Sequence, residues 1–67
     1  MTERLDNKTV ERIRAVLDEH GYWYPAALVR AAMDGQGRWR NKEGAWMEVT
    51  QAMRENCKYA AREAGLL

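Results

Sequence analysis

Hydrophobic residues recur at helical spacing near the start of the chain. Between roughly Asn7 and His20 they fall every three or four positions and form one stripe, which predicts an amphipathic helix. Asp6 before the stripe is a good N-cap residue, and Gly21 after it is a typical C-terminal stop. The stripe consists of Val10, Ile13, Val16 and Leu17.

A second, shorter helix is predicted over Ala26 to Met33. Pro25 suits the first turn of a helix, where its missing N–H costs nothing, and Gly35 ends the apolar pattern. The apolar face of this segment is formed by Leu28, Val29, Ala32 and Met33. Its four alanines favour the helix intrinsically.

The last part of the chain carries helical spacing for about five turns. We expect a third helix that begins near Lys42 or Glu43, with Asn41 as its cap and Gly65 as its stop. The apolar positions are Trp46, Val49, Met53, Cys57, Ala60 and Ala64. The primary prediction is therefore an all-α, three-helix domain that spans residues 1–67.

One alternative fold keeps the first two helices and changes the middle of the chain. Residues 38–40 and 45–47 can pair as a short β-hairpin at residues 38–47, with the turn at residues 41–44. The last helix then starts near Glu48, and the domain is winged-helix-like.

The expected core draws on all three predicted helices. It comprises Val10, Ile13, Leu17, Leu28, Val29, Ala32, Trp46, Val49, Met53, Cys57 and Ala60. A chain of 67 residues buries a small core, so partner binding or homodimerisation is an expected source of extra stability.

Charge is concentrated in the middle of the chain, although the formal net charge is only +1. Residues 26–42 hold Arg30, Arg38, Arg40 and Lys42 against the single acid Asp34. Arg38, Trp39, Arg40, Asn41 and Lys42 are the candidate binding residues, with Arg30 in support. Arginine and lysine bind phosphates, tryptophan stacks on bases and asparagine reads a base edge. The competing interpretation places Trp39 in the core with the cations as its solvated neighbours.

Three adjacent aromatic residues follow the first predicted helix. They cannot all face the core from one connection, and exposed tyrosine is typical of protein interfaces. We expect Trp23 to plug the core, whereas Tyr22 and Tyr24 are candidates for a protein interface and equally for solvated tyrosines. Met47, off the apolar stripe, is a further candidate contact.

Catalytic chemistry is not expected from this sequence. One histidine and one cysteine cannot close a zinc site, and no phosphate-binding loop or nucleophile elbow is present. Cys57 lies on an apolar stripe, and His20 lies at a predicted helix end. We therefore predict no catalytic residues, no metal, no cofactor and no enzymatic activity.

The predicted location is the cytoplasm. No apolar run reaches the length of a membrane span, the first six residues lack the apolar core of a signal peptide, and the only cysteine is a free thiol. We expect no membrane partner.

Two hypotheses for function remain open. The first is a small non-enzymatic regulator that binds nucleic acid through residues 38–42. The second is a protein-binding inhibitor or adaptor that occludes a larger complex stoichiometrically. In length the chain resembles small phage-encoded regulators, including transcription regulators and anti-CRISPR proteins, a resemblance of size class alone.

Overall fold

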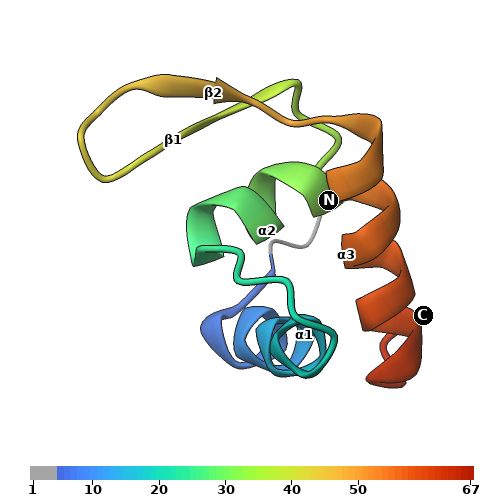
Figure 1. Cartoon of the computed structure of the whole chain (residues 1–67). Coiled ribbons are helices and arrows are strands. Elements are labelled where there is room, and N and C mark those ends of the chain that lie inside the picture. Colours follow the sequence, from blue (N-terminus) through green and yellow to red (C-terminus); the bar gives the residue numbers. More distant parts are fainter. Residues whose placement is uncertain (1–4) are drawn as a thin grey trace.

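The computed structural model describes residues 5–67, which form three helices and one antiparallel β-hairpin (Figure 1). The elements are α1 (Asn7–Glu19), α2 (Ala26–Met33), β1 (Arg38–Arg40), β2 (Trp46–Glu48) and α3 (Gln51–Glu63). The three predicted helices are present, but the fold is not purely all-α, because a hairpin separates α2 from α3 as in the alternative prediction, with its second strand one residue later than predicted. The prediction that the first six residues do not form a signal peptide rests partly on residues 1–4, which lie outside the described residues.

The ends of α1 follow the predicted capping pattern. The Asp6 carboxylate accepts a hydrogen bond from the Thr9 N–H at 2.8 Å. Hydrogen bonding to the side chain and backbone of Thr9 lowers the pKa of Asp6. At the other end, the N–H of Gly21 donates to the Asp18 carbonyl at 3.0 Å. The prediction of this helix is confirmed to within one residue at its C-terminus.

The hairpin occupies the residues in which the apolar spacing predicted the start of the third helix. Its register pairs Arg38 with Glu48, Trp39 with Met47, and Arg40 with Trp46. The five residues between the strands form the connecting loop.

Local bonding within that loop favours the hairpin over a helix. The Asn41 side-chain oxygen accepts hydrogen bonds from the N–H groups of Glu43 at 3.0 Å and Ala45 at 2.9 Å. Gly44 has φ +83°, a left-handed conformation that side chains other than glycine adopt at a cost. Asn41 therefore stabilises a turn and does not cap a helix.

The third helix begins at Gln51, later than either prediction placed it. Thr50 is its N-cap, and its hydroxyl accepts a hydrogen bond from the Met53 N–H at 3.2 Å. The Met53 sulfur in turn accepts from the Thr50 N–H at 3.5 Å. This reciprocal pair fixes the direction in which the chain leaves the hairpin and enters α3.

The buried apolar side chains form one cluster to which all three helices contribute. The cluster comprises Val10, Ile13, Leu17, Leu28, Val29, Ala31, Ala32, Val49, Cys57, Ala60 and Ala61. Most of the predicted core is confirmed, with Met53 half-buried at its edge. Trp46 is the error, because it is 58% exposed on the hairpin.

The hairpin lies across α2 on the side opposite α1, and its closed end points away from α3 (Figure 1). At its open end, the Val49 N–H donates to the Gly37 carbonyl at 2.9 Å. The Arg54 guanidinium donates to the Gln36 carbonyl at 3.2 Å, which joins α3 to the chain entering β1. One end of the hairpin is thus tied to the helices while the other projects. None of the helices described combines the length and apolar character needed to cross a bilayer.

Candidate functional site

The hairpin sorts its side chains onto two faces. Because side chains alternate along a strand and cross-strand partners share a face, Arg38, Arg40, Trp46 and Glu48 lie together. Trp39 and Met47 lie on the opposite face. We call Arg38, Arg40 and Trp46, together with Lys42 in the loop, the hairpin face.

Two guanidinium groups lie against one exposed indole on the hairpin face. The central guanidinium carbons of Arg38 and Arg40 are 5.7 and 5.8 Å from the centroid of the Trp46 ring. Both distances fall within the range of cation–π attraction, about 6 Å. Neither guanidinium forms an ion pair with a carboxylate of residues 5–67. Two cations are therefore held beside a flat aromatic surface, and Glu48, the cross-strand partner of Arg38, is the acid on the same face.

Arg40 is also fixed by the loop. Its Nε–H donates to the Gly44 carbonyl at 3.1 Å, which leaves the other N–H groups of the guanidinium without a bond to the described residues. Lys42 lies exposed in the same loop. Asn41 uses its side-chain oxygen within the loop, as described above, so only its amide N–H groups remain for a ligand.

Trp39 and Met47 occupy the opposite face of the hairpin. Trp39 is half-buried and packs against the core cluster, whereas Met47 is 44% exposed. The Trp39 Nε1–H is covered and has no hydrogen-bond acceptor among residues 5–67. Trp39 therefore attaches the hairpin to the helices, and its Nε1–H group is left without a hydrogen bond.

The hydrogen bonds of Arg30 stabilise the fold. Its guanidinium donates to the Leu5 carbonyl at 2.6 Å and to the Asn7 side chain, which ties α2 to the start of α1. Arg30 nevertheless lines a groove of about 270 Å³ together with Arg40 and Trp46. The structure thus brings the predicted supporting cation near the hairpin face, with its hydrogen bonds directed into the protein.

A second groove, of about 370 Å³, lies between the hairpin and the α1–α2 connection. We call it the tryptophan groove. Its lining residues are Trp23, Pro25, Ala27, Trp39, Arg40, Asn41, Lys42 and Glu43. Arg40 and Ala27 line both grooves, so the two hollows are neighbours on one surface.

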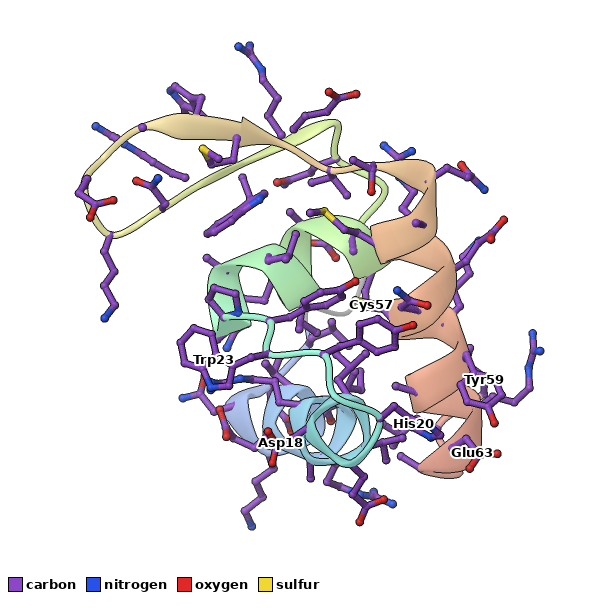
Figure 2. The ribbon with its side chains drawn as sticks, viewed as in Figure 1. Asp18, His20, Trp23, Cys57, Tyr59 and Glu63 are labelled. Atoms are coloured by element: carbon purple, nitrogen blue, oxygen red, sulfur yellow. The ribbon has the colours of Figure 1, made fainter. Side chains whose placement is uncertain are left out.

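The α1–α2 connection presents Trp23 to solvent and not to the core. Trp23 is 69% exposed, so the prediction that it plugs the core is wrong (Figure 2). The reason is competition for space, because Tyr24 occupies the inner position and its hydroxyl accepts a hydrogen bond from Asn56 at 2.9 Å. Tyr22 is 43% exposed and lies against Tyr24 with the two rings tilted by 44° and 5.9 Å between their centroids.

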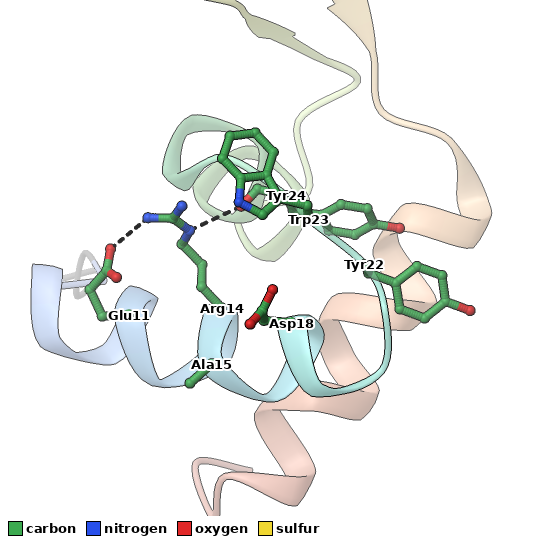
Figure 3. Close-up of a pocket in the computed structure, with 7 residues that line it drawn as sticks. All are labelled: Glu11, Arg14, Ala15, Asp18, Tyr22, Trp23 and Tyr24. Atoms are coloured by element: carbon green, nitrogen blue, oxygen red, sulfur yellow. Dashed lines mark hydrogen bonds and ion pairs between the residues drawn. The ribbon is translucent and has the colours of Figure 1, made fainter.

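Hydrogen bonds hold the backbone on both sides of Trp23. The Tyr22 N–H donates to the Leu17 carbonyl at 2.8 Å. The Arg14 Nε–H donates to the Tyr24 carbonyl at 3.0 Å, and Arg14 is itself paired with Glu11 at 2.9 Å (Figure 3). Trp23 is therefore an exposed aromatic side chain on an anchored backbone.

Cys57 and His20, the two residues considered for catalysis, do not line either groove. Cys57 is fully buried, and this burial raises the pKa of its thiol to about 11. A protonated, covered thiol is a poor nucleophile at neutral pH. His20 packs edge-on against Tyr59 at the end of α1, with 5.5 Å between the ring centroids (Figure 2). In the described part of the chain, no three His, Cys, Asp or Glu side chains gather as ligands for a metal ion.

Sequence reasoning missed two members of this surface, Trp23 and Trp46, because both were assigned to the core. The hairpin alternative did not place Trp46 correctly either, because strands at residues 38–40 and 45–47 with a turn at residues 41–44 pair Trp46 with Trp39. The observed loop is one residue longer, so Trp46 pairs with Arg40 and shares a face with Arg38 and Arg40. The spacing from Trp46 to Val49 also fits a helix, and that fit concealed the alternation.

Comparison with protein-family models, with curated proteins and with solved structures found no significant match to this chain.

Proposed function

We propose that this chain is a small non-enzymatic regulatory domain that binds nucleic acid through the hairpin face. The observation that carries the proposal is the pair of guanidinium groups, neither of them in an ion pair among the described residues, against the exposed Trp46 ring. Arginine binds phosphate with two parallel hydrogen bonds, and an exposed indole stacks on a base. Arg38, Arg40 and Lys42 supply the positive charge for the backbone of the ligand.

The shape of the hairpin also supports the proposal. The free end of the hairpin projects from the helices, so the hairpin face is accessible to a strand of nucleic acid (Figure 1). In this proposal the hairpin acts as the wing of a winged-helix-like domain. The exposed face of α2 offers Ala27 and few polar groups, so the hairpin and not α2 makes the main contact. The proposal places the protein in the cytoplasm, where its single thiol stays reduced.

Charge reversal on the hairpin tests the proposal. A double variant, Arg38→Glu with Arg40→Glu, should lower the affinity for a labelled oligonucleotide by at least about tenfold, equivalent to ~1.4 kcal/mol. Fluorescence anisotropy with single-stranded and duplex oligonucleotides measures this loss.

The matched control reverses two cations elsewhere. Lys58→Glu with Arg62→Glu changes the net charge equally, on the exposed side of α3 and outside both grooves. The control should keep most of the affinity. Equal losses in the two double variants would contradict a role specific to the hairpin, as would unchanged affinity in the hairpin variant with its fold intact.

A protein-binding inhibitor or adaptor is the second candidate. The exposure of Tyr22 and Trp23 on an anchored connection favours it, because exposed aromatic anchors typically dominate protein interfaces. A stoichiometric complex that resists nuclease, with no oligonucleotide binding, would support this candidate over the first. Homodimerisation through the same aromatic residues is compatible with either function.

A further inference from the structure

The tryptophan groove joins exposed aromatic surface to positive charge. We propose that this groove binds one unstacked base of a single-stranded nucleic acid, so that the protein prefers single strands to duplexes. The inference rests on the proposed function and adds a second contact site to it. The hairpin face holds the backbone in this proposal, and the groove selects the form of the ligand.

The walls of the groove suit a flat ring. Trp23 and Trp39 stand on two separate segments, the α1–α2 connection and β1, and Pro25 and Ala27 add apolar surface. The volume of about 370 Å³ lies at the lower end of the range of ligand pockets, about 300–1,000 Å³. Such a space is large enough for one planar ring.

The charges on the groove identify the occupant. Arg40 and Lys42 line it against one acid, Glu43, so the balance favours a ligand that carries negative charge next to its aromatic part. A nucleotide has that combination, because each base is linked to a phosphate. An apolar peptide would bring aromatic surface without the charge that these cations bind.

Arg40 connects the groove to the hairpin face. It lines the groove, and its guanidinium lies 5.8 Å from the Trp46 ring centroid. Trp39 lies on the other face of the hairpin from Trp46, so Arg40 is the residue shared by the two sites. In this proposal a strand that contacts Arg40 turns one base around the edge of the hairpin into the groove.

Placing one base in the groove costs less free energy for a single strand than for a duplex. A paired base must be unstacked and unpaired before it can enter a groove, which costs a few kcal/mol. A single strand presents free bases, and each base stacked on an aromatic side chain strengthens binding by about 1–3 kcal/mol, roughly 5- to 150-fold. The anchored backbone at Trp23 reduces the ordering that binding requires.

Oligonucleotide binding by the full chain and its Trp23→Ala variant tests the groove. The probes are an oligothymidylate and a duplex of the same length, measured by anisotropy at one salt concentration. Wild type should bind the single strand at least about tenfold more tightly than the duplex, and Trp23→Ala should lose about tenfold on the single strand alone. Because Trp23 is exposed, the variant should keep the unfolding midpoint of the wild type. Trp23→Tyr should restore most of the loss, since its ring can still stack.

The outcomes separate this inference from the proposed function. If Trp23→Ala leaves the ratio of single-strand to duplex affinity unchanged, while Arg38→Glu with Arg40→Glu lowers both, the groove inference is wrong and the proposed function stands. If wild type binds neither probe, the proposed function fails and the inference fails with it. A protein that binds duplex more tightly than single strand would overturn the inference in the same way.

Discussion

At the scale of single residues, Cys57 marks the centre of the core and has no part in the candidate site. Its side chain is fully buried, and the cause of its raised pKa is desolvation of the thiolate. The folded protein therefore favours the neutral thiol, and the unfolded chain releases the proton at lower pH. This difference makes the free energy of unfolding depend on pH above the ordinary thiol range.

The free energy of unfolding of the wild type should fall as the pH rises from 9 to about 11. The lower limit is the ordinary pKa of a thiol, and the upper limit is the pKa of Cys57 in the folded protein. Within that window the unfolded state binds fewer protons than the folded state, so each pH unit removes at most about 1.4 kcal/mol. Below pH 9 this contribution is fully present. Urea unfolding at several pH values measures the slope.

Cys57→Ala is the reference for that slope, because other groups also ionise at high pH. The variant starts from lower stability, since it leaves space in the core, and its stability should fall less steeply between pH 9 and 11. Parallel curves for wild type and variant would show that the thiol does not titrate as described.

At the scale of elements, the hairpin depends on its attachments. A two-stranded hairpin is marginally stable alone in water. Trp39 packs it on the core cluster, and the contacts of Val49 and Arg54 close its open end. The Thr50 cap then turns the chain into α3. Loss of the cap should weaken both the helix and the base of the hairpin.

Thr50→Ala should lower the free energy of unfolding by about 1 kcal/mol, because the Met53 N–H at the start of α3 loses its acceptor. Thr50→Ser keeps the hydroxyl and should retain most of the stability. Chemical denaturation of the two variants and the wild type gives the comparison. A Thr50→Ser variant as unstable as Thr50→Ala would show that the hydroxyl is not the stabilising group.

The helices could be predicted from the sequence because their signals are local. The stripe of α1, the cap Asp6 and the stop Gly21 all lie within the segment that they define. The start of α3 could not be placed, because the spacing of Trp46 and Val49 continues smoothly into the helix. The competing signal lies in the loop, where Asn41 bonds two backbone N–H groups, and apolar spacing does not report it.

Part of the candidate site could also be predicted, because its signal is local in the sequence. Arg38, Arg40 and Lys42 are exposed on the hairpin, and they stand out in the sequence as a cluster of charge. The position of Trp23 depends on which aromatic side chain of its segment fills the inner space. Tyr24 fills it through packing and its bond to Asn56, a contact 32 positions away in the chain. No local pattern contains that information.

At the scale of the whole molecule, the two halves of the proposed interface come from segments distant in sequence. The α1–α2 connection supplies Trp23, and the hairpin supplies the cations and Trp46. The helices hold these two segments over one core, so the surface exists only in the folded chain. The hairpin face has three cations, Arg38, Arg40 and Lys42, so the electrostatic contribution to binding should be modest.

The salt dependence of oligonucleotide binding shows whether the cations of the hairpin face bind phosphates. If Arg38, Arg40 and Lys42 each neutralise one phosphate of a single strand, a plot of log affinity against log salt should have a slope of about −2. Anisotropy titrations between about 50 and 200 mM salt give this slope. A slope near −2 that becomes shallower in Arg38→Glu with Arg40→Glu is the predicted result. Affinity that does not change with salt, or no binding at the lowest salt concentration, would contradict the claim that this hairpin binds nucleic acid.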